Sequence, residues 1–351
     1  MKKELLIGTA LVSTLGAASV AEAVTATMSG NHKVGIETES PDSGGDSRSN
    51  NNDNNFTVSL SETTDGGITI SSSFMLLNEN SNGGDYDAGF NLAFTDGSSL
   101  DIINAGNASG SHDISVPGSA GSEGITLTTS NKAPTGLDFA AGSTQFGVEY
   151  HTASDFMMDG LKMSFSASTD NGATTSTTYK VDGHIGVGAT YVTDAGDTTV
   201  TMGFGYSETE GAVSGTSPLN DEGGIHAGIS AVTGDLTVAV GFADGESIES
   251  VTASTPASEV DGEVVKVGAK YVSGDLTFNV GVTSGNAHDN SFAGTDRSGE
   301  DSVETTSASV SYAVASGVTA ILGYSNTESQ NEGAADDKDG SAWYIGANMS
   351  F

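Results

Sequence analysis

The connectors between the β-like runs of this chain alternate in length from residue 24 to residue 351. A tight turn of a few residues is followed by a long, acidic and polar segment, and this order repeats along the chain. When every strand of a sheet crosses a membrane, successive connectors face opposite compartments and differ in length in this way. The pattern therefore predicts an all-β fold, a transmembrane antiparallel β-barrel with short periplasmic turns and long external loops.

The connectors also predict the number of strands. Seven short connectors fall at residues 65–67, 96–98, 154–159, 194–197, 234–235, 274–275 and 316–317. Eight long segments fall at residues 40–55, 79–85, 107–143, 169–178, 209–222, 243–260, 284–301 and 327–339. All five prolines lie in the long segments, which supports these boundaries because proline removes a hydrogen bond from a strand ladder. Seven turns and eight loops separate about sixteen strands.

The predicted strands have one apolar face and one face of small or polar residues. In residues 236–242 the even positions are Leu, Val, Val and Phe, whereas the odd positions are Thr, Ala and Gly. A barrel in lipid turns its apolar face outward and its polar face toward a wet lumen. The inward positions include Gly186, Gly188, Thr190, Gly203, Gly228 and Gly241. Such small residues favour an open lumen over one filled by interlocking side chains.

Composition excludes several classes of protein. The 351 residues carry 46 acidic and 11 basic side chains, a net charge of −35, so nucleic acid and anionic lipid are poor partners. The acidity fits a halophilic habitat, a cation-attracting pore mouth or a disordered protein, and the regular strand pattern argues against disorder. Cysteine is absent, and beyond the first residues no apolar run approaches the ~20 residues of a membrane helix.

The first 23 residues have the pattern of a secretory signal peptide. Lys2 and Lys3 precede an apolar stretch at residues 5–20, and Ala21 and Ala23 form a small-x-small cleavage site. The predicted mature chain starts at Val24, and residues 24–351 form a single barrel domain.

Aromatic residues mark one end of the predicted strands. Tyr150, Tyr191, Tyr271 and Tyr312 each lie a few residues before a short turn, in the outward phase. Tyrosine rings suit the headgroup level of a bilayer, so these four residues predict an aromatic girdle. The last strand, at residues 341–351, places Trp343 and Phe351 in one phase and ends the chain on an aromatic residue.

The leader, the sequence VTATMSG at residues 24–30 and the terminal Phe351 together resemble the general diffusion porins of Gram-negative bacteria. The resemblance covers the whole mature chain. It implies passive diffusion of small hydrophilic solutes and ions across the outer membrane through a sixteen-stranded homotrimer embedded in outer-membrane lipid. It also implies that residues 343–351 are the signal read by the barrel-assembly machinery, with Trp343 and Phe351 as its aromatic residues.

The same resemblance implies that the third long segment folds into the barrel and narrows it. This candidate constriction loop, residues 107–143, contains Asp113, Glu123 and Asp138 with one cation, Lys132. Carboxylates in a narrow aqueous passage attract cations, so we expect a cation-selective pore. The segment lacks the Pro-Glu-Phe-Gly-Gly stretch of enteric porins, and an external solvated loop is the alternative.

Porins usually oppose that loop with clustered basic residues, and here the sequence departs from the family. Arg48 and Arg297 fall in predicted external loops. The lysines expected to point into the lumen are Lys33, Lys162, Lys180, Lys266 and Lys270. They are scattered over four strands, so the predicted field favours cations and weakens with salt.

No cofactor or catalytic motif is evident in the sequence. His151, His184 and His226 have the lumen phase, but no pair of histidines has the spacing of a zinc site, and we expect no enzyme. Two acidic clusters offer hard oxygen ligands for Ca²⁺ without an EF-hand spacing. Their residues are Asp289, Asp296, Glu300 and Asp301, and Glu332, Asp336, Asp337 and Asp339.

A second class of function fits the loop acidity equally well. A non-conducting surface protein, structural or adhesive, would use its external loops and close its lumen. The filling of the lumen distinguishes the two hypotheses.

Overall fold

The computed structural model describes residues 24–42, 45–78, 89–103, 108–118, 147–168, 181–211, 220–249, 258–291, 299–330 and 338–351. The predicted signal peptide at residues 1–23 lies outside these ranges.

Sixteen strands of the described chain form one closed sheet in which every neighbouring pair is antiparallel. The strands are β1 (Thr25–Pro41), β2 (Ser47–Thr63), β3 (Thr69–Asn78), β4 (Phe90–Ala93), β5 (Ser99–Ile102), β6 (Val148–His151), β7 (Leu161–Ser168), β8 (Val181–Ala195), β9 (Thr198–Gly211), β10 (Asn220–Thr233), β11 (Leu236–Glu249), β12 (Ser258–Ser273), β13 (Leu276–Ser291), β14 (Gly299–Ala315), β15 (Val318–Gln330) and β16 (Lys338–Ser350). The predicted sixteen-stranded barrel is confirmed.

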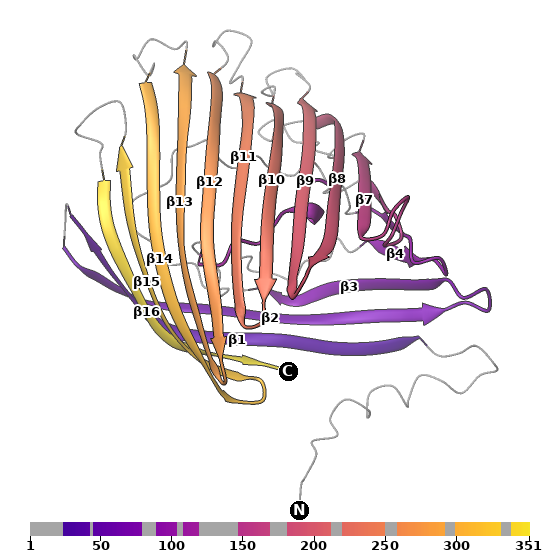
Figure 1. Cartoon of the computed structure of the whole chain (residues 1–351), viewed down its shortest axis with the longest axis horizontal. Helices are drawn as coiled ribbons and strands as arrows, with labels where there is room; N and C mark the ends of the chain where they lie inside the picture. The colour runs from indigo at the N-terminus through magenta and orange to yellow at the C-terminus, as the bar shows by residue number, and fades with distance from the viewer. Residues whose placement is uncertain are drawn as a thin grey trace, which may run out of the picture.

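The barrel closes between its first and last strands. In Figure 1 the yellow strand β16 lies beside the indigo strand β1, and the register runs from Asn31 opposite Ser350 to Pro41 opposite Gly340. Gly30 and Phe351 then exchange backbone hydrogen bonds of 3.2 and 3.1 Å. Closure leaves no sheet edge, which a bilayer requires because unpaired backbone groups are costly in hydrocarbon.

The tight connectors rely on glycine where the backbone turns sharply. Gly234 and Gly274 have φ values of 55° and 62°, a region that glycine enters without a steric penalty. They join β10 to β11 and β12 to β13 as two-residue hairpin loops.

The predicted long segments are wrong at their boundaries, because the strands continue further than the apolar pattern does. β2 begins at Ser47, inside the predicted segment 40–55, and β11 extends to Glu249, inside 243–260. The extension of β2 at residues 47–55 is polar throughout, and that of β11 has no regular apolar alternation, so hydrophobic periodicity does not detect them, although their backbones still pair. Pro41 is likewise the last residue of β1 rather than part of a loop.

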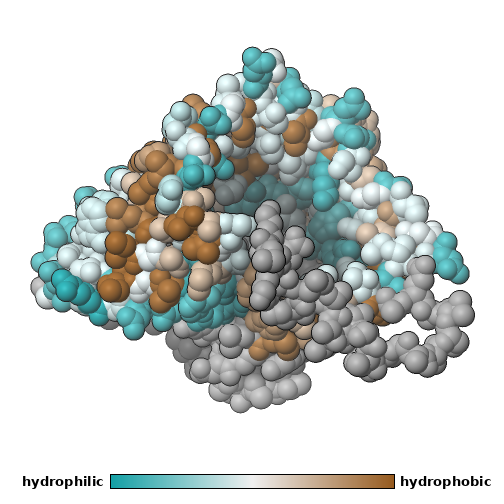
Figure 2. Space-filling view, turned by 90° about the horizontal axis from the view of Figure 1, so that it is seen from below, coloured by the Kyte–Doolittle hydropathy of each residue, from teal (hydrophilic) through white to brown (hydrophobic). Residues whose placement is uncertain are grey.

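The two faces of the wall differ as the sequence predicts. On β11 the outward Val238 and Val240 are 44% and 43% exposed, whereas the inward Ala239 is 3% exposed. In Figure 2, brown apolar side chains gather on the outer wall and teal side chains surround the hollow. Within the described chain, no helix has the length and apolar character needed to cross a bilayer.

Candidate functional site

A segment of the third long connector, between β5 and β6, crosses the inside of the barrel. This inner segment, residues 108–118, is tied at one end by the Ala108 backbone N–H, which donates to Ser166 Oγ on β7 at 3.2 Å. At the other end, Ser307 on β14 donates to the Gly118 carbonyl oxygen. Its short 3-10 turn, Gly110–His112, contacts β8 and β9 and is visible behind them in Figure 1.

The inner segment rests on a row of glycines on the barrel wall. A Cβ at Gly203 would overlap the His112 carbonyl oxygen, and one at Gly268 would overlap the Pro117 carbonyl oxygen. At Gly228 it would lie 2.7 Å from Cβ of Ile114. The full row, which we call the glycine seat, consists of Gly188, Gly203, Gly205, Gly228, Gly268 and Gly281.

The glycine seat corrects one interpretation of the sequence. Inward glycines such as Gly188, Gly203 and Gly228 were expected to leave the lumen open, but here they make room for the inner segment. Ile114 and Val116 pack with Ala239 against this wall, at 8%, 5% and 3% exposure. A signal was present in the sequence, because inward glycines recur six or seven residues from the tight turns at 194–197, 234–235 and 274–275.

A chain of hydrogen-bonded side chains fastens the 3-10 turn to the wall. His151 Nε2 lies 3.0 Å from Asp101 Oδ2, and His151 Nδ1 lies 2.6 Å from Ser164 Oγ. The same Ser164 Oγ lies 2.7 Å from His112 Nε2, and His112 Nδ1 lies 2.6 Å from Thr190 Oγ1. Five residues from four strands and the inner segment are therefore linked in one line.

Two further contacts hold the same turn. Ser111 Oγ donates to Glu149 Oε1 at 2.9 Å, and His226 Nε2 donates to the Ser109 carbonyl oxygen at 2.8 Å. The other ring nitrogen of His226 lies 3.8 Å from Asp113 Oδ1. Two of the histidines predicted in the lumen phase, His151 and His226, thus help to hold the inner segment. The third, His184, instead lies 2.9 Å from the Thr209 hydroxyl.

Burial lowers the pKa of His112 to about 4, and the positive charges of Lys162, His151 and His226 act in the same direction. The imidazole is therefore neutral at pH 7. A neutral imidazole has one donor and one acceptor nitrogen, which matches the two partners of His112.

The predicted constriction carboxylates are only partly within the described chain. Asp113 follows the 3-10 turn, has a side chain that is 59% exposed, and lines a hollow together with His226 and Lys266. Glu123 and Asp138 lie outside the described residues.

The predicted lumen lysines do not form one cluster. Lys162 lines one hollow with His112 and His151, and Lys266 lines another with Asp113 and His226. Lys33 pairs with Asp53 at 3.0 Å, and Lys270 lies on β12 in the inward phase. Lys180 lies outside the described residues.

The two residues of the predicted assembly signal lie on the outer face of β16 and at the chain end. The Trp343 ring is 4.5 Å from that of Tyr324, and the Phe351 ring is 6.1 Å from that of Phe56, measured between centroids. Recognition by the assembly machinery stays a prediction.

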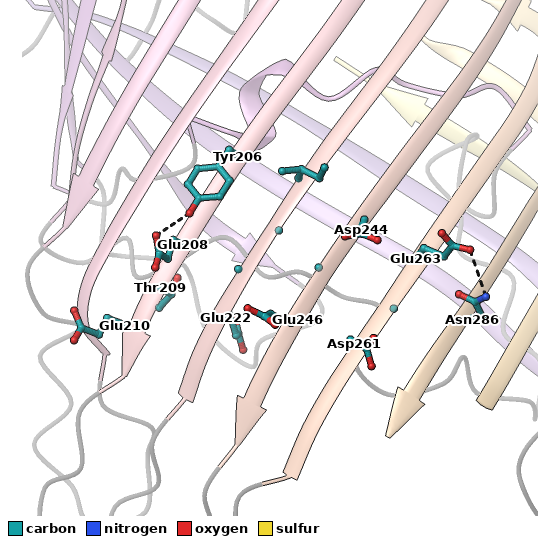
Figure 3. Close-up of a pocket in the computed structure, with 15 residues that line it drawn as sticks. Tyr206, Glu208, Thr209, Glu210, Glu222, Asp244, Glu246, Asp261, Glu263 and Asn286 are labelled. Atoms are coloured by element: carbon teal, nitrogen blue, oxygen red, sulfur yellow. Dashed lines mark hydrogen bonds between the residues drawn. The ribbon is translucent and has the colours of Figure 1, made fainter. Parts of the chain in front are cut away.

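A second charged feature lies on the outer face, beyond the apolar band of β9 to β12. Along β11 the outward phase passes from Phe242 to Asp244 and Glu246, and along β9 it passes from Phe204 to Tyr206 and Glu208. Figure 3 shows Tyr206, Glu208, Asp244 and Glu246, with the Tyr206 hydroxyl donating to Glu208 at 2.7 Å. Because charge is costly in hydrocarbon, this change marks the external boundary of the membrane.

The predicted calcium ligands are almost all beyond what the structure describes. Side chains at 289, 296, 300, 301, 332, 336 and 337 fall outside it, while Asp339 is exposed at the start of β16. Among described residues, no group of three His, Asp or Glu side chains is arranged to hold a metal ion. Calcium binding stays a prediction.

One family model matches this chain over most of its length. The family model described as Gram-negative porin matches residues 8–332. No curated protein sequence matches the chain.

Similar solved structures share the fold at low sequence identity. OmpT of Vibrio cholerae in a trimer form superposes with a TM-score of 0.64 at 11% identity, covering 94% of this chain and 100% of that one. An anion-selective porin from Comamonas acidovorans gives 0.61 at 12%, covering 93% and 100%. A mutant of the Rh. blastica porin gives 0.58 at 15%, covering 93% and 100%.

Proposed function

This chain belongs to the Gram-negative porin family and is a diffusion porin of the outer membrane, and from this premise we propose that its passage favours small hydrophilic cations. The family predicted from the sequence is thereby confirmed. The proposed selectivity concerns this chain alone, because the same fold also occurs in a porin described as anion-selective.

The exposed Asp113 carboxylate on the inner segment carries the proposal. Its side chain is 59% exposed inside the lumen, whereas Lys33 is paired with Asp53 and so contributes little field. Lys162 and Lys266 line hollows beside the inner segment, and their positive charges partly offset the negative charge of Asp113. The excess of 46 acidic over 11 basic residues in the chain supplies the longer-range bias toward cations.

We infer that passage involves no chemical step. Asp101, His151 and Ser164 lie in the order of a hydrolytic triad, but Ser164 is 0% exposed and its hydroxyl is held between two imidazoles. A solute in the lumen does not reach that hydroxyl, so it is not an available nucleophile.

We also propose a homotrimer, supported by the family and by the trimer described for the similar OmpT. The folded protein is expected to migrate as a trimer on unheated gels and as a monomer after boiling. A folded barrel that migrates only as a monomer in native lipid extracts would contradict the trimer.

Substitution at Asp113 tests the selectivity. In water-like surroundings the Asp113 carboxylate attracts a cation 4 Å away by about 1 kcal/mol, and removing the charge loses this attraction. The loss corresponds to a roughly fivefold fall in the cation-to-anion permeability ratio. Asp113→Asn is therefore expected to lower the cation-to-anion permeability ratio several-fold, and Asp113→Lys to lower it further. The measurement is the reversal potential of single channels in a salt gradient.

Glu210→Gln is the matched control, because it removes an exposed carboxylate of the outer face and should leave the ratio unchanged. Raising the salt concentration should reduce the preference in wild type, since the Debye length shortens. An anion-preferring wild type would contradict the proposal. A folded protein that never conducts would favour the surface-protein alternative.

A further inference from the structure

We propose that a hollow on the external side of the inner segment binds small zwitterionic solutes, with Asp113 holding the ammonium group and Lys266 holding the carboxylate. Amino acids are the chemical class that carries these two charges on a small frame. The inference deepens the proposed diffusion function by naming a solute class, and it rests on that function for the entry of solutes from outside.

The hollow lies between the inner segment and the wall on which that segment rests. Its volume is about 270 Å³, near the lower end of the range of about 300–1,000 Å³ for ligand sites, so it suits a small solute. The inner segment borders it with residues 109, 110, 113 and 114, and β9 to β12 supply the rest of the lining. Three inward wall residues, Gly224, Gly241 and Ala243, have side chains too small to fill it.

A solute that enters from outside meets this hollow before it passes the inner segment. The wall residues Ser207, His226 and Lys266 lie on β9, β10 and β12. Each is nearer the external end of its strand than the glycine seat is on that strand. Asp113 is 59% exposed, so a solute in the lumen reaches its carboxylate.

The two opposite charges of the hollow do not neutralise each other. Among the described residues, no carboxylate forms an ion pair with Lys266. Asp113 approaches His226 instead, with Oδ1 at 3.8 Å from Nδ1. Because β10 and β12 are two strand spacings apart, His226 and Lys266 are separated by about 10 Å across the sheet. A negative and a positive group therefore face one space with room for a solute between them.

His226 adds an unsatisfied acceptor beside Asp113. Its Nε2–H donates to the Ser109 carbonyl oxygen, so Nδ1 of the neutral ring is an acceptor. This nitrogen is buried and has no hydrogen-bond partner within the described chain, since 3.8 Å to Asp113 is too long for a hydrogen bond. A solute ammonium group has three donors, so it would pair with the carboxylate and supply the donor that the nitrogen lacks.

Only a solute with both charges matches the hollow. A cation gains Asp113 but brings its charge near Lys266, and an anion gains Lys266 but lies near Asp113. A zwitterion pairs with both through charge-assisted hydrogen bonds. Losing one contact between unit charges about 4 Å apart, in water-like surroundings, corresponds to roughly fivefold weaker binding.

Binding of matched solutes to the folded barrel tests the site without requiring conduction. The probe is 4-aminobutyrate, and its single-charge analogues are butylamine and butyrate. Ligand-observed NMR titration of the refolded protein in detergent micelles gives the three dissociation constants. We expect the constant to be roughly fivefold higher for each analogue than for 4-aminobutyrate. Equal binding of the three solutes would overturn the site.

Reversing one charge distinguishes a binding residue from a merely structural one. Lys266→Glu makes both charged groups of the hollow carboxylates, so this variant should lose 4-aminobutyrate and gain affinity for 1,4-diaminobutane. A misfolded barrel would not gain a new ligand. Asp113→Asn should weaken 4-aminobutyrate binding roughly fivefold. Gel mobility of the unheated protein verifies that each barrel stays folded.

Lys162→Gln is the matched control. Lys162 lines a different hollow, which includes Ser154 and Asp155 of a tight turn and so lies toward the periplasmic ends of the strands. Removing this lysine from the lumen should keep the wild-type affinity for 4-aminobutyrate. An unchanged affinity in Lys266→Glu, or an equal loss in Lys162→Gln, would overturn the site.

Single-channel recording gives the functional readout. We expect 4-aminobutyrate to interrupt the ionic current at a lower concentration than butylamine or butyrate does. Binding by a barrel that never conducts would support the site and contradict the diffusion function. Conduction by a barrel that does not bind 4-aminobutyrate would overturn the site and leave the diffusion function standing, so the two failures are distinguishable.

Discussion

Replacing Gly203 and Gly268 by alanine is expected to lift the inner segment off the barrel wall and reduce single-channel conductance. Each new Cβ would overlap a backbone carbonyl oxygen of the segment, at His112 and Pro117 respectively, and backbone does not yield as a flexible side chain does. Because the segment is tied at Ser166 and Ser307, its displaced middle must bulge into the passage. Overpacking of this kind costs about 1–3 kcal/mol at each site.

The control is another strand glycine with room for a methyl group. A Cβ at Gly223 on β10 would lie 3.8 Å from the Ser207 carbonyl oxygen, an ordinary contact, so Gly223→Ala should keep wild-type conductance. Planar-bilayer recordings on refolded protein make the comparison. Wild-type conductance in the double alanine variant would mean that the segment does not rest on the glycine seat.

Arginine at Val240 is expected to destabilise the folded barrel by about 2–4 kcal/mol, the cost of a cation on the lipid face near the bilayer midplane. Val240 is 43% exposed on the outer face and lies opposite Ile229 and Val267 in the sheet. Denaturant unfolding of protein refolded into lipid vesicles measures the change.

Glu246→Arg on the same strand face is the control. It lies beyond the apolar band, near the external boundary of the membrane, where such a charge costs about 0–1 kcal/mol. Equal destabilisation by the two arginines would contradict the assignment of the apolar band to lipid and of the carboxylates to the aqueous side.

The fold was predictable because its constraints are local. Alternation along residues 236–242, the tight turns at Gly234 and Gly274 and the absence of proline within most strands are each visible in a few consecutive residues. A membrane strand must pair all its backbone hydrogen-bonding groups with neighbouring strands and must present one apolar face to lipid. These local signals therefore point to one fold, a closed antiparallel barrel. The strand ends were less predictable, because the residues that pair beyond the membrane do not alternate between apolar and polar.

The candidate site was predictable only in part. Asp113 was singled out from the longest connector, and the structure places it on a segment inside the barrel. Ser164 and Thr190 gave no signal, since a serine or threonine in the inward phase looks like any other wet lumen residue. Their role depends on His112, which is 52 residues from Ser164 and 78 from Thr190 in the chain.

The sequence by itself determined that this chain is a closed membrane barrel, which side of each strand meets lipid, and that the whole carries a large negative charge. Only the tertiary structure decided what the lumen contains: that inward glycines seat a segment rather than leave space, and that two histidines meet at one buried serine. The physical reason is the range of the interactions. Strand pairing and the apolar face are set by neighbouring residues, whereas the glycine seat and the serine shared by two imidazoles exist only once distant strands curve round to enclose a common interior.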